Sequence, residues 1–559
     1  MPFKQLKILL GSTVVGLLLG ALGAAAAHFF GTGIQILEQL SLDYLPFNKK
    51  FIILFCTLSL AAILITTVKN LLGIKSWHGP ADTIFAAHRV DNELDVKTGI
   101  SSTIVAFISA AGGASVGQYG PLVHFGATLG AFMKSLFKLK ISTDIVLGGG
   151  VAAAISAGFS APLAGILFAH EAILRHMSVK ALAPIALASG TAYGINSFLW
   201  ESSPLLPQTY SNISLLPMIL VSLVVGPFFG LVSIVFMQSV LRFSWLSKKL
   251  DVSKGLSFGI AILGLSAIGS IFPEVMGLGT QSIIDLASEN KLFLAAVGIL
   301  FAKIIATSLS IGFGFYGGVF SPALLVGAAA GSAITAIVNH TGLYEFAGPE
   351  LVICGMAAVA GAVVGAPLSM IIIVLELTGS YSLALTSTVG IATATVISGQ
   401  LFGNSIFDKQ LKQRKINISQ GRLGLRLMEE KIKSIINSSA LKFDSRTKAS
   451  VALQTLIKEH QTEAYVVSDD NQYIGKLHLG SLFNAKNSDL VTTVIDHTAI
   501  TIKSDASLQQ AIEAAANFIG EAIPVVETES RNFLGTINEG DIFKLYLTLQ
   551  GQTIDLEKR

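Results

Sequence analysis

A short pattern of glycine, proline and small residues occurs twice in the chain and constrains its fold more than any other feature. The second copy lies 201 residues after the first. The shared positions are Gly117, Pro121, Gly126, Ala127 and Gly130 in the first copy, and Gly318, Pro322, Gly327, Ala328 and Gly331 in the second. Each copy predicts a chain reversal that leads into a helix, because proline is favoured in a first helical turn. The unsatisfied N–H groups of such a helix start can bind an anion.

A second motif shows the same duplication. The copies are Ala161-Pro162-Leu163-Ala164-Gly165 followed by Glu171, and Ala366-Pro367-Leu368-Ser369-Met370 followed by Glu376. They are 205 residues apart, close to the spacing of the first pair. Two motif pairs at nearly one offset indicate two repeats, roughly 1–200 and 213–410.

The repeats are too apolar for a soluble protein. The 559-residue chain is 52% hydrophobic and 13% charged, with a mean hydropathy of +0.67. Apolar segments run at about 8–29, 51–73, 98–115, 121–137, 144–174, 179–199, 213–241, 255–271, 292–311, 321–339, 350–377 and 382–402. Several are long enough to cross a bilayer, whereas others are interrupted by Gly and Pro, which is tolerated at membrane depth only inside protein or along a cavity. We therefore expect an all-α polytopic membrane protein with broken half-helices around a transport site.

The basic residues predict the orientation in the membrane. Lys4 and Lys7 precede the first apolar segment, which we interpret as a membrane helix rather than a signal peptide. Lys409, Lys412, Arg414 and Lys415 follow the last apolar segment. Both ends should be cytoplasmic, with the join between the repeats outside, so the repeats should be inverted relative to each other.

The composition changes at about residue 408. Residues 351–400 contain one charged residue, and residues 401–450 contain fifteen. The tail predicts a soluble α/β region made of two units, each with the order helix, strand, helix, strand, strand, helix. The predicted boundaries are 1–410 for the membrane domain, 411–430 for a linker, 431–486 for the first tail unit and 488–548 for the second.

These motifs, in this order and spacing, resemble the CLC chloride channel and transporter family with a C-terminal pair of CBS domains. The matching pieces are Gly117-Gln118-Tyr119-Gly120-Pro121, Gly318-Val319-Phe320-Ser321-Pro322, Ala161–Gly165 with Glu171, and Ala366-Pro367 with Glu376. The resemblance implies inverted repeats and a homodimer in which each subunit has its own anion pathway. It also implies half-helices whose N-termini point at a central anion.

Site residues follow from the same resemblance. The backbone N–H groups of Val319 and Phe320 should bind the anion, and those of Gln118, Tyr119 and Gly120 should line the outer part of the pathway.

Two further parts of the family pattern are altered. Lys75–Pro80 falls where the family has a serine-containing anion loop, and Trp77 or His78 takes the coordinating position. Phe407 falls where most members have a central tyrosine that donates its hydroxyl to the ion.

Two departures bear on mechanism. Tyr119 occupies the position of the family's gating glutamate, and Ala172 occupies that of the exchangers' internal proton-transfer glutamate. A phenol has a pKa of about 10 and stays neutral at physiological pH. We therefore expect a neutral gate at Tyr119 and no tight proton coupling, and we hypothesise that the Tyr119 hydroxyl donates to the anion.

The expected function is a channel or passive transporter for chloride or another small monovalent anion, with bicarbonate and nitrate left open. One alternative is an anion/proton exchanger that uses a different proton route, for which His170 and Glu171 are the candidates. Another is an anion-binding sensor with little flux, plugged by Tyr119. An enzyme is not expected, because no nucleophile–base pair or metal-ligand cluster appears and Cys56 and Cys354 lie far apart.

Other polar residues in apolar runs have structural interpretations. For His124, His170 and His176, a structural hydrogen bond is favoured over a functional role. Lys303 either shapes an anion vestibule or contacts backbone carbonyls or an interface.

In the tail, Asn538 and Asp541 occupy positions at which CBS domains hold the ribose of an adenine nucleotide. A purely structural dimerisation module is the favoured alternative. No metal cofactor and no nucleic-acid partner are expected, and the expected location is the inner membrane of a bacterium.

Overall fold

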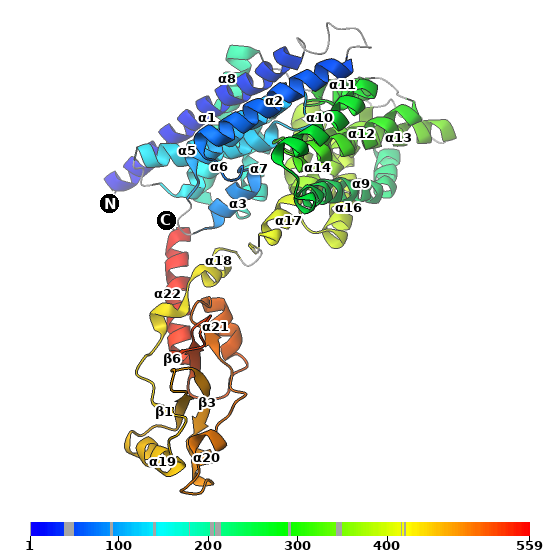
Figure 1. Ribbon diagram of the computed structural model, residues 1–559. Coiled ribbons are helices and arrows are strands. Elements are labelled where there is room, and N and C mark those ends of the chain that lie inside the picture. Colours follow the sequence, from blue (N-terminus) through cyan, green and yellow to red (C-terminus); the bar gives the residue numbers. More distant parts are fainter. Residues whose placement is uncertain are drawn as a thin grey trace. The chain divides into compact units, whose positions relative to one another are not determined.

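The structure is a computed structural model that describes residues 2–38, 50–89, 93–137, 141–177, 179–201, 206, 214–288, 292–342, 349–414, 416–418 and 421–558. It contains two compact units, Met1–Lys415 and Ile416–Arg559. The first unit is helical, and the second combines short strands with helices (Figure 1).

The first unit consists of two halves with matching helices. The first half contains α1 (Pro2–Glu38), α2 (Lys50–Leu72), α3 (Pro80–His88), α4 (Val96–Ala111), α5 (Tyr119–Leu136), α6 (Thr143–Phe159), α7 (Pro162–Phe168), the π-helix η3 (Ala169–Leu174) and α8 (Val179–Trp200). The second half contains α9 (Leu215–Leu250), α10 (Lys254–Ile271), the 3₁₀ turn η4 (Pro273–Val275), α11 (Thr280–Ser288), α12 (Phe293–Gly312), α13 (Phe320–Thr341), α14 (Pro349–Val364), α15 (Pro367–Thr378), α16 (Tyr381–Leu401) and α17 (Ile406–Gln413).

The two halves pack in the same way. In the first half, α5 packs on α6, and α6 and α1 both pack on α8. In the second half, α13 packs on α14, and α14 and α9 both pack on α16. The duplicated glycines allow the close helix contacts, because a Cβ at Gly126 would lie 2.1 Å from the oxygen of Gly150 and a Cβ at Gly327 would lie 2.3 Å from that of Gly355.

Two apolar runs that the sequence presents as continuous are each broken into two helices. The run 144–174 is interrupted at Ser160, which has a φ of 52°, and the run 350–377 at Gly365, which has a φ of 76°. In each case the next helix begins with proline, at Pro162 and at Pro367. A left-handed residue followed by Pro at the first helical position ends one helix and starts the next.

Each of these second helices is capped by a glutamate from the opposite half. The hydrogen bonds run from the N–H groups of Leu163 and Ala164 to Glu376 (2.9 Å each), and from the N–H groups of Leu368 and Ser369 (2.9 and 2.8 Å) and the Ser369 hydroxyl (2.6 Å) to Glu171. Carboxylates satisfy otherwise unpaired N–H groups at a helix start. Each repeat therefore supplies the glutamate that caps a helix of the other repeat, and the two caps hold α7 and α15 together.

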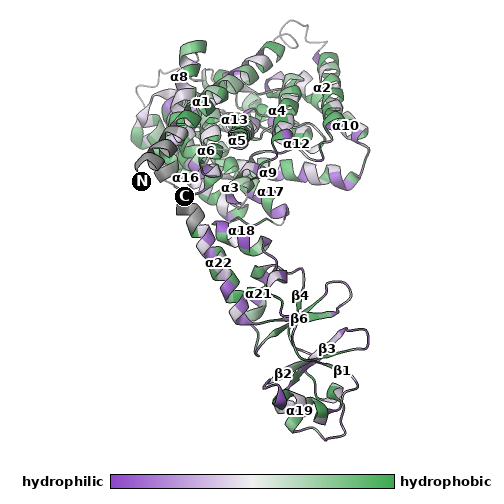
Figure 2. Ribbon diagram, turned by 90° about the vertical axis from the view of Figure 1, so that its left-hand side faces the viewer, coloured by the Kyte–Doolittle hydropathy of each residue, from purple (hydrophilic) through white to green (hydrophobic). Residues whose placement is uncertain are grey.

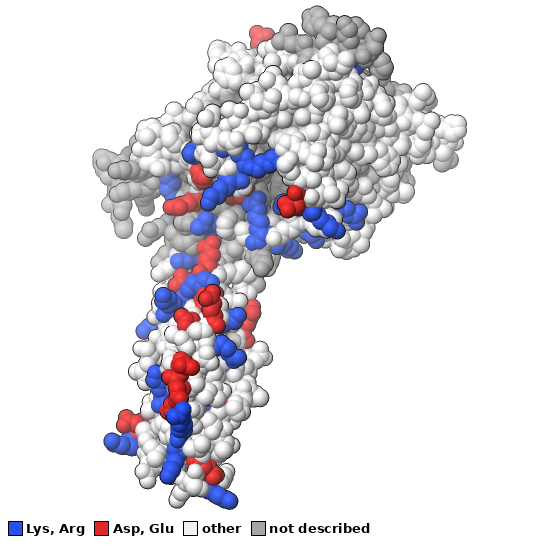
Figure 3. All heavy atoms as spheres, in the orientation of Figure 1, with Lys and Arg blue, Asp and Glu red and all other residues white. Residues whose placement is uncertain are grey.

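The first unit has the surface of a membrane protein. Within the described residues, seven helices are long and apolar enough to cross a bilayer, and five further apolar helices are shorter. Figure 2 shows hydrophobic residues throughout this unit, and much of its surface in Figure 3 carries no charged side chain. The short helices include α7 and α15, so the interrupted segments lie at matching places in the two halves.

The second unit contains two modules of the same topology. The first has η5 (Ile432–Ile435), β1 (Lys442–Asp444), α19 (Ala449–Lys458), β2 (Glu463–Val467), β3 (Tyr473–His478) and α20 (Leu479–Phe483). The second has η6 (Val491–Thr493), β4 (Ile502–Lys503), α21 (Leu508–Ala515), β5 (Ile523–Val526), β6 (Phe533–Ile537) and α22 (Glu539–Lys558). In each, a central strand pairs parallel to the first and antiparallel to the third, with Lys442 opposite Tyr465 and Ile502 opposite Val525.

The range predicted as a linker, 411–430, contains a helix. This is α18 (Gly421–Glu429), whose Leu423 and Leu427 pack on the core of the second module. Leucines four positions apart give α18 one hydrophobic face. The charged residues around them hid this helical pattern in the sequence.

A buried ion pair ties the two modules together. Lys476 of β3 and Glu463 of β2 are 2.6 Å apart, with 1% and 7% of their side chains exposed. Glu463 also accepts the N–H of Glu521 at 3.1 Å, and Lys476 donates to the oxygen of Ala522 at 3.3 Å. Loss of one partner would leave an uncompensated buried charge.

We predict that Lys476→Met lowers the free energy of unfolding of the tail by about 3–5 kcal/mol, because Glu463 loses its cation in a buried site. Hydrogen–deuterium exchange of β2 and β5 in the full chain measures the loss as faster exchange. The matched control is Arg446→Met, which removes the exposed pair with Asp469 and should cost under about 1 kcal/mol. Equal protection in the two variants would contradict the prediction.

Candidate functional site

The two copies of the first motif are hydrogen-bonded to each other. The N–H of Gly117 donates to the oxygen of Gly318 at 2.7 Å, and the N–H of Gly318 donates to the oxygen of Gly117 at 2.8 Å. Helix α5 begins two residues after Gly117 and α13 two residues after Gly318. The pair therefore brings the N-termini of two half-helices from opposite repeats to one place.

Glycine is required in both loops for steric reasons. A Cβ at Gly117 would lie 2.8 Å from both Pro322 Cδ and Ser321 Oγ, and a Cβ at Gly318 would lie 2.9 Å from the backbone nitrogen of Gly120. These distances are too short for a carbon atom. The Ser321 hydroxyl also accepts the N–H of Gln118 at 3.2 Å, so this N–H is already paired.

The starts of α5 and α13 differ from those of α3, α7, α15 and α17. Their N-cap residues, Gln118 and Val319, make no side-chain cap. Helices α7 and α15 are capped by Glu376 and Glu171 as described above. In α3, Asp82 accepts the N–H of Gly79 at 2.9 Å, and in α17, Ser405 accepts the N–H of Asp408 at 3.1 Å.

The starts of α5 and α13 therefore bring backbone N–H donors that lack a helix cap close together. The first N–H groups of a helix have no acceptor within the helix. At α5 and α13 the side chain of the N-cap residue accepts none of them, and the helix dipoles add partial positive charge. The protein's own carboxylates occupy the starts of α3, α7 and α15, whereas α5 and α13 have no such cap.

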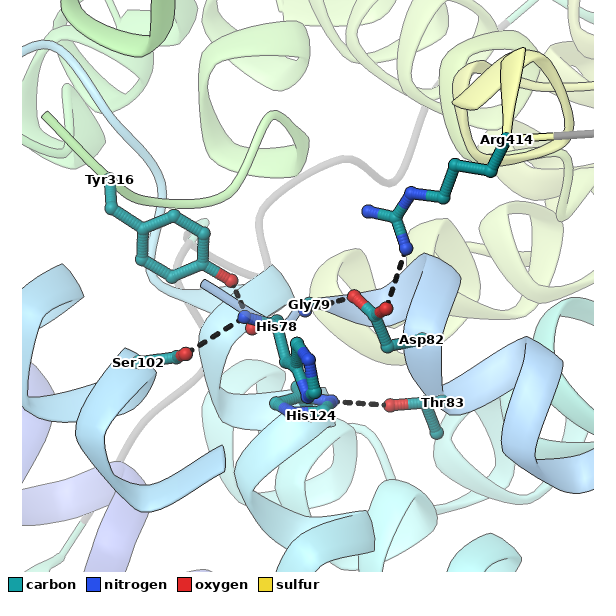
Figure 4. A network of polar contacts seen from close by, with 8 residues as sticks. All are labelled: His78, Gly79, Asp82, Thr83, Ser102, His124, Tyr316 and Arg414. Carbon is teal, nitrogen blue, oxygen red and sulfur yellow. Dashed lines mark hydrogen bonds and ion pairs between the residues drawn. The ribbon is translucent and has the colours of Figure 1, made fainter. Parts of the chain in front are cut away.

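The loop before α3 lies against the same two starts. A Cβ at Gly120 would be 3.0 Å from Gly318 Cα and 3.6 Å from Pro80 Cγ. The Tyr316 hydroxyl donates to the backbone oxygen of His78, as Figure 4 shows. The sequence-predicted positions Trp77 and His78 are thus brought to the site, and Trp77 packs on Tyr316 with ring centroids 6.2 Å apart.

Four aromatic rings cover the two helix starts. Tyr119 stacks on Phe159 with centroids 3.8 Å apart and meets the edge of Phe320 at 5.6 Å. Phe320 is also 5.4 Å from Phe159 and 5.9 Å from Phe168. Tyr119 is only 5% exposed. The rings make a closed apolar cluster around the residues that carry the unpaired N–H groups.

Phe407 is buried near the start of α17, with 5% of its surface exposed. The helix is anchored by its next residue, since Asp408 forms an ion pair with Arg175 at 2.6 Å. Among the described residues, no ring contact joins Phe407 to the four-ring cluster.

His170 and Glu171, the candidates for a proton route, make hydrogen bonds to different partners. Glu171 caps α15, whereas Nδ1 of His170 lies 3.0 Å from the backbone oxygen of His176. Adjacent residues on a helix point in different directions, which separates the two groups. Both still line one pocket of about 630 Å³, together with Arg175 and Asp408. Ala172 is buried in η3.

Lys303 and Asn538 both make hydrogen bonds with backbone groups. The Lys303 ammonium is fully buried and donates to the oxygens of Val275 and Gly277 at 2.9 and 3.1 Å. The Asn538 side chain accepts the N–H of Asp541 at 2.7 Å and so caps α22. Because residues distant in sequence supply the acceptors for Lys303, its role could not be read from the apolar run around it.

We predict that Gly318→Ala forces the two helix starts apart and destabilises the first unit by about 1–3 kcal/mol, the usual cost of overpacking. The measurement is the melting temperature of the purified protein in detergent. Gly190→Ala is the matched control, since a Cβ at Gly190 in α8 meets no atom within 4 Å and Ala favours the helix. A melting temperature for Gly318→Ala equal to that of the control would contradict the proposed close approach.

Comparison with known proteins agrees with this architecture. The family described as voltage gated chloride channel matches residues 60–399, and the CBS domain family matches residues 491–548. An H(+)/Cl(-) exchange transporter ClcA of Salmonella agona is 31% identical over 319 residues, 54% of this chain and 67% of the relative. A voltage-gated ClC-type chloride channel ClcB of Shigella flexneri is 25% identical over 344 residues, 60% of this chain and 81% of the relative.

Solved structures share this fold. A eukaryotic CLC transporter superposes with a TM-score of 0.63 at 18% identity, covering 95% of this chain and 98% of that one. The predicted helical fold with an α/β CBS region is confirmed, as is the predicted resemblance. The protein is an integral, multi-pass membrane protein, and it belongs to the voltage gated chloride channel family, whose members are anion transporters and channels.

Proposed function

We propose that the protein is a passive conduit for chloride or a similar small monovalent anion, without tight proton coupling. The observation that carries this proposal is the meeting of the α5 and α13 starts, which have no side-chain cap while the carboxylates of the unit occupy other helix starts. The backbone N–H groups of Val319 and Phe320 bind the anion, and those of Tyr119 and Gly120 line the outer part of the pathway. Gln118, whose N–H is held by Ser321, lines it beside them. Backbone donors at helix starts suit a small anion without adding a fixed charge.

Tyr119 is the gate in this proposal. Its ring packs against both Phe159 and Phe320 at the start of α5, and in this proposal the anion reaches the N–H groups only when the ring turns away. The phenol is neutral and does not compete with the anion as a carboxylate would. Its hydroxyl donates to the anion in the open arrangement.

The case against proton coupling rests on the titratable groups near the pathway. Tyr119 and Ala172 replace the two glutamates that the exchangers of the family use. Glu171 and Glu376 each accept two backbone N–H groups, so both carboxylates are occupied as helix caps.

The competing proposal is an anion/proton exchanger, and it is favoured by a specific relative. The ClcA protein that is 31% identical to this chain is described as an H(+)/Cl(-) exchange transporter. Such an exchanger would need a proton route through groups such as His170.

The remaining assignments complete the proposal. Trp77 or His78 lines the pathway beside α3, and Phe407 lines it beside α17. The protein works as a homodimer in a bacterial inner membrane, with both termini cytoplasmic and the membrane domain ending near residue 410. The CBS pair spans 431–486 and 488–548, and Asn538 and Asp541 are its candidates for an adenine nucleotide.

The test is anion flux from liposomes that contain the purified protein. Efflux of chloride, bicarbonate and nitrate in separate experiments establishes transport and ranks the anions. With a chloride gradient and a small opposing pH gradient, a passive conduit has a reversal potential set by chloride alone. Uphill proton movement at a fixed ratio to chloride would establish the exchanger instead, and binding without efflux would establish a sensor.

We predict that Tyr119→Ala raises anion efflux at least about tenfold, because the aromatic cluster over the helix starts loses one of its stacked rings. The measurement is the initial rate of chloride efflux per unit of reconstituted protein. Unchanged efflux would contradict the assignment of Tyr119 as the gate.

We also predict that Tyr119→Phe keeps the gate but weakens anion binding by about threefold to tenfold, the value of one hydrogen bond. Isothermal titration with chloride measures the affinity. The matched control is Tyr193→Phe in α8, whose ring is 40% exposed and which should bind as the native protein does. Equal chloride affinities for the native protein and both variants would contradict a hydrogen bond from the Tyr119 hydroxyl to the anion.

A further inference from the structure

Ser321, the second residue of α13, brings a hydroxyl group to the place where the two helix starts meet. The residue is only 3% exposed. Its hydroxyl oxygen accepts the N–H of Gln118 at 3.2 Å. A Cβ at Gly117 would lie 2.8 Å from this oxygen and 2.9 Å from the Ser321 nitrogen. The hydroxyl therefore lies between α13, which carries it, and the loop that leads into α5.

The proton of this hydroxyl has no acceptor among the described residues. A serine hydroxyl has one donor and two acceptor positions, and the bond from Gln118 occupies an acceptor position. A buried donor without an acceptor costs free energy. An acceptor that binds beside Ser321 would recover this cost.

The backbone of Ser321 offers a second donor at the same place. The first helical residues of α13 are Phe320, Ser321 and Pro322. Proline has no N–H, and the next backbone bond runs from the N–H of Ala323 to the oxygen of Val319 at 3.0 Å. The N–H groups of Phe320 and Ser321 are therefore donors for which the helix supplies no acceptor.

The start of α15 shows how a serine in a first helical turn can bind an anionic group. Ser369 donates both its N–H, at 2.8 Å, and its hydroxyl, at 2.6 Å, to one oxygen of the Glu171 carboxylate. Ser369 is the third residue of α15, and Ser321 is the second residue of α13. Both serines thus carry the same two donors in a first turn, and at α15 an anionic group takes both.

The two repeats differ at the position of Ser321. The corresponding residue of the first repeat, 201 positions earlier, is Gly120. A Cβ at Gly120 would lie 3.0 Å from Gly318 Cα and 3.6 Å from Pro80 Cγ, so this side of the site has little room for a side chain. Of the two equivalent positions, the one on α13 carries a side-chain donor.

We propose that the Ser321 hydroxyl is a direct ligand of the anion and sets which anions the site prefers. Its oxygen stays bound to the N–H of Gln118, while its proton points to the anion that the backbone of α13 holds. The attraction falls as the distance between the proton and the centre of the negative charge grows. The hydroxyl therefore favours a small anion such as chloride over a large one such as thiocyanate. This rests on the proposed function, because it requires an anion at the start of α13.

Binding of two anions of different size tests the proposal. Purified full-length protein in detergent is titrated with sodium chloride and, in a separate experiment, with sodium thiocyanate, and calorimetry measures both affinities. For Ser321→Ala we expect the chloride affinity to fall by about threefold to tenfold, the value of one hydrogen bond. The thiocyanate affinity should fall less, so the ratio of chloride affinity to thiocyanate affinity should also fall.

A second variant separates hydrogen bonding from packing. Ser321→Cys fills the place of the hydroxyl, but a thiol is a weak donor, so its chloride affinity should fall as in Ser321→Ala. The matched control is Ser332→Ala, about 16 Å further along the same helix. Ser332 is also 3% exposed, and this variant should bind both anions as the native protein does. The melting temperature in detergent shows that each variant is folded.

The outcomes separate this proposal from the proposed function. Chloride affinities of Ser321→Ala and Ser321→Cys equal to that of the native protein would overturn the role of the hydroxyl and leave the anion conduit standing. Equal losses of chloride and thiocyanate affinity would also overturn it, because a distorted site affects both anions alike. No chloride binding by the native protein would overturn the proposed function, and the role of the hydroxyl with it.

Discussion

The backbone pair between Gly117 and Gly318 is the contact on which the rest of the site depends. Its two hydrogen bonds join loops from opposite repeats, and each loop leads directly into a half-helix. Without this pair, the starts of α5 and α13 would not meet, and the rings of Tyr119 and Phe320 would not lie over them. The close approach leaves no space for a Cβ at either glycine. The close contact between the backbones of these two glycines therefore determines where the two helix starts meet.

The positions of the acceptor groups elsewhere in the unit are the reason why we propose this centre as the anion site. Each broken helix exposes N–H groups that need acceptors. Glu171 and Glu376 cross between the repeats to supply them at α15 and α7, and Asp82 supplies one at α3. The starts of α5 and α13 are joined by the backbone pair and by the Ser321 hydroxyl, and aromatic rings pack over them. The carboxylates of Asp82, Glu171 and Glu376 are thus bound to N–H groups other than those of α5 and α13, where two positive helix ends converge.

The parts of the fold that could be predicted from the sequence are those set by local residue chemistry. Gly117, Pro121 and their repeats identified the half-helix starts, and the abrupt rise in charge after residue 408 identified the tail. The sequence did not indicate which acceptor caps which helix, because Glu171 and Leu368 are 197 residues apart. For the same reason the separation of Glu171 from His170 was not foreseen. The contact between His78 and His124 was also hidden, since a short loop and a helix 46 residues later meet only through tertiary packing.

The nature of the gate has a consequence for how such a conduit can respond to pH. A carboxylate at the position of Tyr119 would bind at the anion's own site, so protonation would remove a competitor. A neutral ring gives no such competition, and any proton effect must come from charge placed beside the site. The ring of Tyr119 would then remain a steric barrier that pH does not remove.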